Sequence, residues 1–264
     1  MPTGAPNAQR VFITGASSGI GAALALRYAA QGAIVGLLGR RGEALERLRA
    51  GCAQPERHRC YVADVSDAAA VAMAAQQFLE HAGGIDVVIA SAGVSVGTLT
   101  EYGQDVPVIV DIFNVNVLGT VFTFAPFINA MKNQRTPARL VGIGSVAGIR
   151  GLPGAEAYSA SKSAVITYCE SLRLELKRHG IAVVTLCPGY IDTPMTRANA
   201  YRMPFLMAPE RFADAALRKI AAGNRYAVIP WQMGVVAKFL RLLPNAAYDG
   251  LFANAPQKKR RVQA

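Results

Sequence analysis

Two residues four positions apart, Tyr158 and Lys162, are the first candidates for chemistry in this sequence. On a helix that spacing puts both side chains on one face, about one turn apart. A phenol with a pKa near ~10 exchanges protons poorly at neutral pH, and a neighbouring ammonium favours its phenolate form. Ser145 follows an apolar run at residues 140–143 that is typical of a buried strand, so its hydroxyl can face the pair. Such a trio could protonate a carbonyl oxygen or take the proton from an alcohol. The alternative is an exposed helix face with a Tyr–Lys packing pair.

A glycine-rich turn near the N-terminus supplies the first supporting element. The β-rich run 10–14 stops at Gly15, and an alanine-rich helical stretch follows the turn to about Gln31. This order of strand, glycine loop and helix is the one that a dinucleotide-binding turn requires, because the helix N-terminus meets the pyrophosphate with free N–H groups. The residues of this turn that we predict to contact a cofactor are Gly15, Ser17, Ser18, Gly19, Ile20 and Gly21.

The end of the second predicted strand, at residues 33–38, indicates which nicotinamide nucleotide is bound. A carboxylate at this place would bind the adenosine ribose of NAD, but position 39 is glycine and no acidic residue precedes Glu43. Arg40 and Arg41 are instead placed for a 2′-phosphate, whose charge suits a guanidinium. NADP(H) is therefore predicted over NAD(H); the alternative is that both arginines are solvated at a helix start.

The rest of the chain continues to alternate predicted strands and helices, with strands near residues 58–63, 85–90, 139–144, 181–187 and 225–229. Apolar strands alternating with helices predict an α/β fold with helices on both faces of the sheet. We expect one Rossmann-type, doubly wound domain with a mainly parallel seven-stranded sheet. The expected divisions are a flexible N-terminus at 1–8, the domain at 9–230, an amphipathic helix region at 231–252 and a basic, disordered tail at 253–264.

Composition narrows the classes of function. The chain has 264 residues, of which 52% are hydrophobic and 17% charged, and this favours an ordered, compact protein. Its formal charge of +11 suits a phosphorylated cofactor or an anionic surface, and no nucleic-acid-binding motif accompanies it, so nucleic acid is not an expected partner.

The three histidines and four cysteines form no metal-ligand spacing, so no metal is predicted. Residues 1–10 show no signal peptide and no apolar run approaches a membrane span of roughly 20 residues, which predicts a cytoplasmic protein with free thiols.

These motifs, taken together and in order, resemble those of the short-chain dehydrogenase/reductase family over roughly residues 9–230. The matching stretches are Thr14–Gly21 (TGASSGIG), Asp64-Val65, Asn116, Ser145, Tyr158-x-x-x-Lys162 and Pro188-Gly189-x-x-x-Thr193. One departure is visible: the usual Asn-Asn-Ala-Gly after the fourth strand reads Ala90-Ser91-Ala92-Gly93 here. The Ala-Gly that approaches the cofactor is kept, while a side-chain contact that supports the central strand is put in doubt.

The resemblance implies a role for each matching residue. Tyr158 would be the general acid for carbonyl reduction, and Lys162 would lower its pKa and bind the nicotinamide ribose. Ser145 would hold the substrate oxygen, and Asn116 would anchor a relay water near Lys162. For the cofactor, Asp64 and Val65 would frame the adenine. Contacts along the rest of the nucleotide are implied for Ala92, Gly93, Pro188, Gly189, Ile191 and Thr193.

The C-terminal third contains two apolar features. Residues 192–209 are irregular, and the family resemblance implies that they form a substrate lid. The apolar cluster Met203, Phe205, Leu206 and Met207 within this region suggests a hydrophobic substrate. Packing of this cluster on the domain's own core is the alternative. Residues 231–243 form an amphipathic helical pattern, and the basic run 258–261 follows downstream. Peripheral contact with an anionic membrane is one interpretation; a subunit interface or a packed C-terminal helix is the other, and is preferred.

The sequence therefore predicts an NADPH-dependent oxidoreductase that interconverts a carbonyl and a secondary alcohol on a hydrophobic, lipid-, steroid- or aromatic-like substrate. Its relatives imply a homodimer or homotetramer. The alternative from another class is a non-catalytic NADP(H)-binding or membrane-associated interaction protein on the same fold. Retention of Ser145, Tyr158 and Lys162 together argues against that alternative.

Overall fold

A single parallel sheet forms the centre of the computed structural model, which describes residues 8–199, 201–255 and 257–260. Within these residues seven strands run parallel in the order β3-β2-β1-β4-β5-β6-β7, which confirms the expected doubly wound sheet. The strands are β1 (Arg10–Thr14), β2 (Ile34–Gly39), β3 (Arg59–Val62), β4 (Val87–Ala90), β5 (Ala138–Ile143), β6 (Ile181–Pro188) and β7 (Tyr226–Ile229). The chain winds outward from β1 to β3 and then crosses back to β4. The carboxyl ends of β1 and β4 therefore diverge into the crevice where such folds bind ligands.

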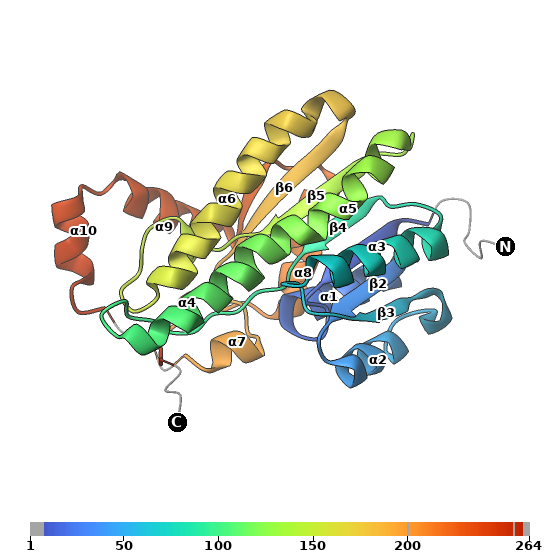
Figure 1. Ribbon diagram of the computed structural model, residues 1–264. Helices are drawn as coiled ribbons and strands as arrows, with labels where there is room; N and C mark the ends of the chain where they lie inside the picture. The colour runs from blue at the N-terminus through green and yellow to red at the C-terminus, as the bar shows by residue number, and fades with distance from the viewer. Residues whose placement is uncertain (1–7, 200, 256, 261–264) are drawn as a thin grey trace.

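Helices cover both faces of the sheet (Figure 1). One buried layer packs α1 and α8 against the strands, and the other packs α3, α5 and α6. The helices are α1 (Gly19–Ala30), α2 (Gly42–Ala50), α3 (Ala68–Ala82), α4 (Val106–Phe113), α5 (Gly119–Asn133), α6 (Glu156–Leu176), α7 (Pro194–Arg197), α8 (Pro209–Ala221), α9 (Trp231–Leu242) and α10 (Asn245–Phe252). Both faces of the strands are thus removed from water, and this is why the strand sequences are almost wholly apolar.

An aromatic cluster fixes the position of β1, the strand that delivers the glycine-rich turn. The fully buried ring of Phe12 lies 5.4 Å from that of Phe78 on α3 and 4.9 Å from that of Phe127 on α5, between ring centroids. Gly36 on β2 makes this possible, since a Cβ atom there would lie 2.6 Å from the Phe78 ring. Buried aromatic pairs of this kind add to the apolar area that holds the layers together.

The helical segment between β4 and β5 is interrupted. Residues Asn114–Leu118 form a π-helical turn between α4 and α5. The whole segment Gly103–Asn133 is long and apolar enough to cross a membrane by length and mean composition, although Asp111, Asn114 and Asn116 interrupt its apolar residues. In the fold it serves as a core helix, because Phe124 and Phe127 are fully buried against the sheet.

The C-terminal region departs from the expected layout. Helix α9 buries Met233 and Ala237 against the domain and leaves Trp231, Phe239 and Leu242 exposed. Residues 257–260, expected within a disordered tail, instead lie against the loop that follows β4, where Gly97 pairs with Arg260 in a parallel bridge. Most of the N-terminal segment 1–8 and residues 261–264 lie outside the described residues.

Candidate active site

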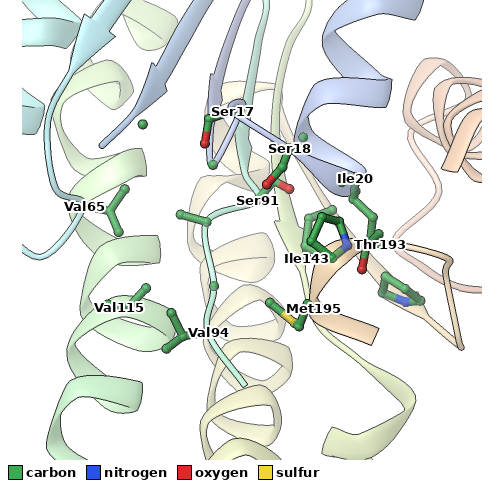
Figure 2. A pocket seen from close by; sticks show the side chains of 18 of the residues that line it. Ser17, Ser18, Ile20, Val65, Ser91, Val94, Val115, Ile143, Thr193 and Met195 are labelled. Atoms are coloured by element: carbon green, nitrogen blue, oxygen red, sulfur yellow. The ribbon is translucent and has the colours of Figure 1, made fainter. Parts of the chain in front are cut away.

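A cleft with about 1270 Å³ of empty space, open solvent at its mouth included, lies at the carboxyl ends of the central strands. Figure 2 shows Ser17, Ser18 and Ile20 on one side, with Val65, Val94 and Val115 on the other. The predicted site residues that line it are Gly15, Ser17, Ser18, Gly19, Ile20, Gly21, Arg40, Arg41, Asp64, Val65, Ala92, Gly93, Ser145, Tyr158, Lys162, Pro188, Gly189, Ile191 and Thr193. Asn116 alone among the predicted site residues does not reach the cleft surface.

The glycine-rich turn is shaped by its contact with the next loop of the crevice. Gly15 has a φ of +68°, and a Cβ atom on it would lie 2.6 Å from the Cα atom of Ala92. Only glycine therefore allows the turn after β1 to touch the loop after β4. Ser18, the N-cap of α1, makes no capping hydrogen bond with its side chain, so the first N–H groups of the helix are available for an anion.

Polar donors gather where the adenosine end of a dinucleotide would lie. A nitrogen of the Arg41 guanidinium donates to the Ser18 hydroxyl at 2.8 Å and to the Ser17 hydroxyl at 3.0 Å. Arg40 forms a longer ion pair with Asp64, at 3.4 Å, and its side chain is 66% exposed. Arg41 and the two serine hydroxyls together have the donor chemistry that a phosphate monoester needs.

Three elements bring the catalytic candidates together. Ser145 follows β5 and accepts a hydrogen bond from the Ala147 N–H at 3.1 Å, which fixes its hydroxyl at the start of a short 3₁₀ turn. Tyr158 and Lys162 lie on α6, and the Lys162 Nζ atom donates to the carbonyl oxygen of Ile143 at 2.9 Å. The same Nζ atom is 6.0 Å from the centroid of the Tyr158 ring. The predicted juxtaposition of strand-end hydroxyl, phenol and ammonium is thus present in the fold.

Burial sets the proton affinities of this cluster. It lowers the pKa of Lys162 to about 8, because the charged ammonium is only 6% exposed and leaves water at a cost. Burial raises the pKa of Tyr158, and a hydrogen bond with Ser145 works in the opposite direction. Within the described residues no carboxylate forms an ion pair with Lys162, so its charge is available to a phenolate or a bound ligand.

Asn116 holds the wall of the cleft from behind. Its side-chain oxygen accepts from the Val94 N–H at 2.8 Å, and its amide donates to the Val94 carbonyl at 3.0 Å and to the Ser161 hydroxyl at 2.9 Å. The residue is fully buried, and the π-helical turn carries it to this position between the loop after β4 and α6. Sequence patterns do not reveal these contacts, because the partners are 22 and 45 positions away.

The far end of the cleft is closed by the segment after β6. Thr193 begins α7 in a capping box with Thr196, in which each side chain accepts from the other residue's backbone. A Cβ atom on Gly19 would lie 3.2 Å from a Thr193 side-chain carbon, so this segment borders the glycine-rich turn. Gly189 similarly leaves room for Met233 of α9.

Of the lid region expected at residues 192–209, residues 193–196 line the cleft, while the apolar cluster at 203–207 does not. Met207 packs against the buried core, which is the alternative that the sequence left open, while Phe205 and Leu206 are exposed. The apolar wall is made instead by Val94, Val115 and Met195, which sequence reasoning missed. Met195 had a signal, since it directly follows Thr193-Pro194.

Comparisons with known proteins identify the family of this chain. The family model described as short chain dehydrogenase matches residues 9–203. An uncharacterized oxidoreductase of Myxococcus xanthus is 36% identical over 244 residues, covering 90% of this chain and 94% of the relative. The dehydrogenase/reductase SDR family member 7B of Bos taurus is 31% identical, covering 95% of this chain and 82% of the relative.

Solved structures show the same fold. Levodione reductase superposes with a TM-score of 0.75 at 26% identity, covering 86% of this chain and 98% of that structure. A 3-ketoacyl-(acyl-carrier-protein) reductase from Brucella melitensis, complexed with NADH, gives a TM-score of 0.75 at 25% identity, covering 85% and 96%.

Proposed function

The chain belongs to the short-chain dehydrogenase/reductase family, and from this premise and its active-site geometry we propose an NADPH-dependent enzyme that interconverts a carbonyl and a secondary alcohol. Oxidoreductase activity dependent on a nicotinamide nucleotide follows from the family. The finer proposal rests above all on one observation, the buried Lys162 ammonium beside the Tyr158 ring. When bound, the cofactor supplies or accepts the hydride.

The chain's own residues handle the proton and the oxygen atom. In reduction, Tyr158 gives its phenolic proton to the substrate oxygen as the oxygen gains negative charge. Lys162 favours the phenolate that this transfer leaves, because an adjacent cation lowers the free energy of the charged form. Ser145 donates a hydrogen bond to the same oxygen and so fixes it near the phenol. In oxidation the proton moves in the reverse direction.

Preference for NADP(H) is supported by the group formed by Arg41, Ser17 and Ser18. Its donors cluster at the end of β2, where Gly39 stands in place of a ribose-binding carboxylate. A 2′-phosphate there gains charge-assisted hydrogen bonds, while NAD has no group to use them. Arg40, turned toward Asp64, would contribute its charge from the rim.

A hydrophobic substrate is supported by the apolar wall of the cleft rather than by the expected lid. Val94 and Met195 line the same cleft as Ser145, Tyr158 and Lys162, while Val115 lies on the side of Val65 (Figure 2). Burial of a lipid-, steroid- or aromatic-like surface against such side chains is favourable by about 25 cal/mol per Å².

The test is nicotinamide oxidation against carbonyls graded from short polar aldehydes to polycyclic ketones, with NADPH or NADH, in wild type and Tyr158→Phe. We expect turnover of the bulky apolar members with NADPH and a loss of at least about 100-fold in kcat in the variant. Equal turnover by Tyr158→Phe would favour the alternative, a non-catalytic NADP(H)-binding protein. Activity confined to small sugars or hydroxy acids would exclude the hydrophobic substrate.

We further propose that the chain forms a homodimer or homotetramer through α4 and the π-helical turn. Val106, Val110 and Leu118 are 48%, 51% and 44% exposed along this segment, a stripe that a second copy could cover.

The membrane alternative for α9 loses part of its support, because Lys258 and Arg260 of the basic run turn toward Ser95 and Asp105 rather than outward. The unpaired state of all four cysteines supports a reducing, cytoplasmic location.

A further inference from the structure

The end of the described chain packs beside the active site, although none of residues 257–260 lines the cleft itself. Residues 257–260 lie between the loop after β4, which contains Gly97, and the loop before α6, which contains Gly154. The N–H of Gly97 donates to the carbonyl oxygen of Lys259 at 3.1 Å. A Cβ atom on Gly97 would collide with the Lys258 carbonyl, and one on Gly154 would lie 2.7 Å from the Gln257 side chain. Both loops therefore leave space that this segment fills.

A buried ion pair anchors the segment. The Arg260 guanidinium donates to both carboxylate oxygens of Asp105, at 2.7 and 3.1 Å, and stacks 3.7 Å from the centroid of the Tyr102 ring. The Asp105 side chain is 2% exposed, so this bidentate pair is largely removed from solvent. Figure 1 shows the chain end returning to the start of α4, where Asp105 lies. Such pairs hold a fixed geometry, and Lys258, two residues away, is held with it.

This anchoring places a second ammonium beside the catalytic tyrosine. The Lys258 Nζ atom lies 5.2 Å from the centroid of the Tyr158 ring and donates to the hydroxyl of Ser95. Among the described residues no carboxylate forms an ion pair with it. One hydroxyl satisfies one of its three N–H donors. Burial lowers the pKa of Lys258 to about 8, because the partly enclosed ammonium loses hydration.

An uncompensated, half-buried cation is stabilised when an anion joins it. Tyr158, whose ring centroid lies 5.2 Å from this ammonium, lines the cleft in which a substrate would bind. We propose that Lys258 is a specificity-determining residue that binds a carboxylate of the substrate, positioned within a few bonds of the reacting carbonyl. The substrate class is then an apolar keto acid, with its hydrophobic body against Val94 and Met195. This inference rests on the proposed carbonyl–alcohol chemistry and names the charge that its substrate carries.

The test compares matched acids and esters on the full chain. The probes are benzoylformate and 3-acetylbenzoate, each against its methyl ester, with wild type, Lys258→Gln and Lys259→Gln. Lys259 is the matched control because its side chain is exposed. We expect wild type to prefer the acid in kcat/KM, and Lys258→Gln to reduce that preference by about tenfold or more, as for a lost charge-assisted hydrogen bond. Lys259→Gln keeps the wild-type preference.

Dissociation constants separate this inference from the proposed function. Calorimetry of the same probes with Tyr158→Phe, saturated with the nicotinamide nucleotide it binds, reports recognition without turnover. If the dissociation constants favour the acids over the esters, and adding Lys258→Gln removes this preference, the carboxylate site is supported. This holds even if wild type shows no turnover and the proposed chemistry is wrong. An acid-to-ester ratio that Lys258→Gln leaves unchanged overturns the inference. So does a Lys258→Gln variant that gains activity equally on acids and esters, because Lys258 would then be blocking the cleft.

Discussion

The Nζ atom of Lys162 lies 6.0 Å from the centroid of the Tyr158 ring, one helical turn away on α6. Its hydrogen bond to the Ile143 carbonyl ties this pair to the end of β5. The sheet edge, rather than the helix alone, therefore sets where the ammonium stands.

Replacing Lys162 should change how stability depends on pH. Burial lowers the Lys162 pKa from 10.5 to about 8, so between these values the unfolded state binds more protons and the free energy of unfolding rises with pH. Below pH 8 both states are protonated and the contribution is constant. We expect the stability of wild type relative to Lys162→Met to increase by about 1.5 kcal/mol between about pH 8 and 9.5, measured by urea unfolding without cofactor. Parallel curves for the two proteins would contradict this, and Lys177→Met, at an exposed lysine, should give such parallel curves.

Removing Arg41 should affect one cofactor and spare the other. Because its guanidinium lies with the Ser17 and Ser18 hydroxyls, Arg41→Ala should raise the KM for NADPH by about 10- to 100-fold. The KM for NADH should stay close to the wild-type value. Arg47→Ala, at an arginine 73% exposed on α2, is the control and should alter neither. An equal rise in KM for both cofactors would show that Arg41 stabilises the glycine-rich loop rather than binding the 2′-phosphate.

Asn116→Ala should destabilise the protein as well as slow it. Truncation leaves the buried N–H of Val94 without its acceptor and the Ser161 hydroxyl without its donor. We expect a loss of about 1–3 kcal/mol in the free energy of unfolding, measured by denaturant titration. Asn114→Ala, on the same π-helical turn, is the comparison, since the described contacts give the Asn114 side chain no hydrogen bond. An Asn116→Ala protein as stable as wild type would show that the hydrogen bonds between Asn116 and the Val94 backbone contribute nothing to the free energy of unfolding.

A charge on α4 should disrupt the proposed oligomer. Val110→Glu puts a carboxylate in the middle of the exposed stripe, and burying it against a second copy is costly. We expect sedimentation of wild type as a dimer or tetramer and of Val110→Glu as a smaller species. Phe239→Glu, on the exposed face of α9, should sediment like wild type. Dissociation by Phe239→Glu alone would move the interface to α9.

The sequence determined the fold and the contents of the cleft to a large extent. Strand ends followed by glycine, serine or arginine mark the carboxyl edge of a parallel sheet, and all such ends meet at one edge. The spacing of Tyr158 and Lys162 fixes their common helix face without any tertiary information. The boundaries of β1 and the α1 start agree with the predicted strand and turn for the same reason, because local backbone preferences decide them.

Tertiary structure decided the contacts between segments distant in sequence. No period or motif connects Lys258 to Ser95, 163 positions away, and a short basic run reads as a solvated tail. The packing of residues 257–260 between two glycine-containing loops places Lys258 beside the Tyr158 ring. Likewise, Met207 and Met195 are both apolar residues of one irregular segment. Only the bridge between Ile191 and Met207, which folds that segment back on the core, decides that Met195 faces the cleft and Met207 does not.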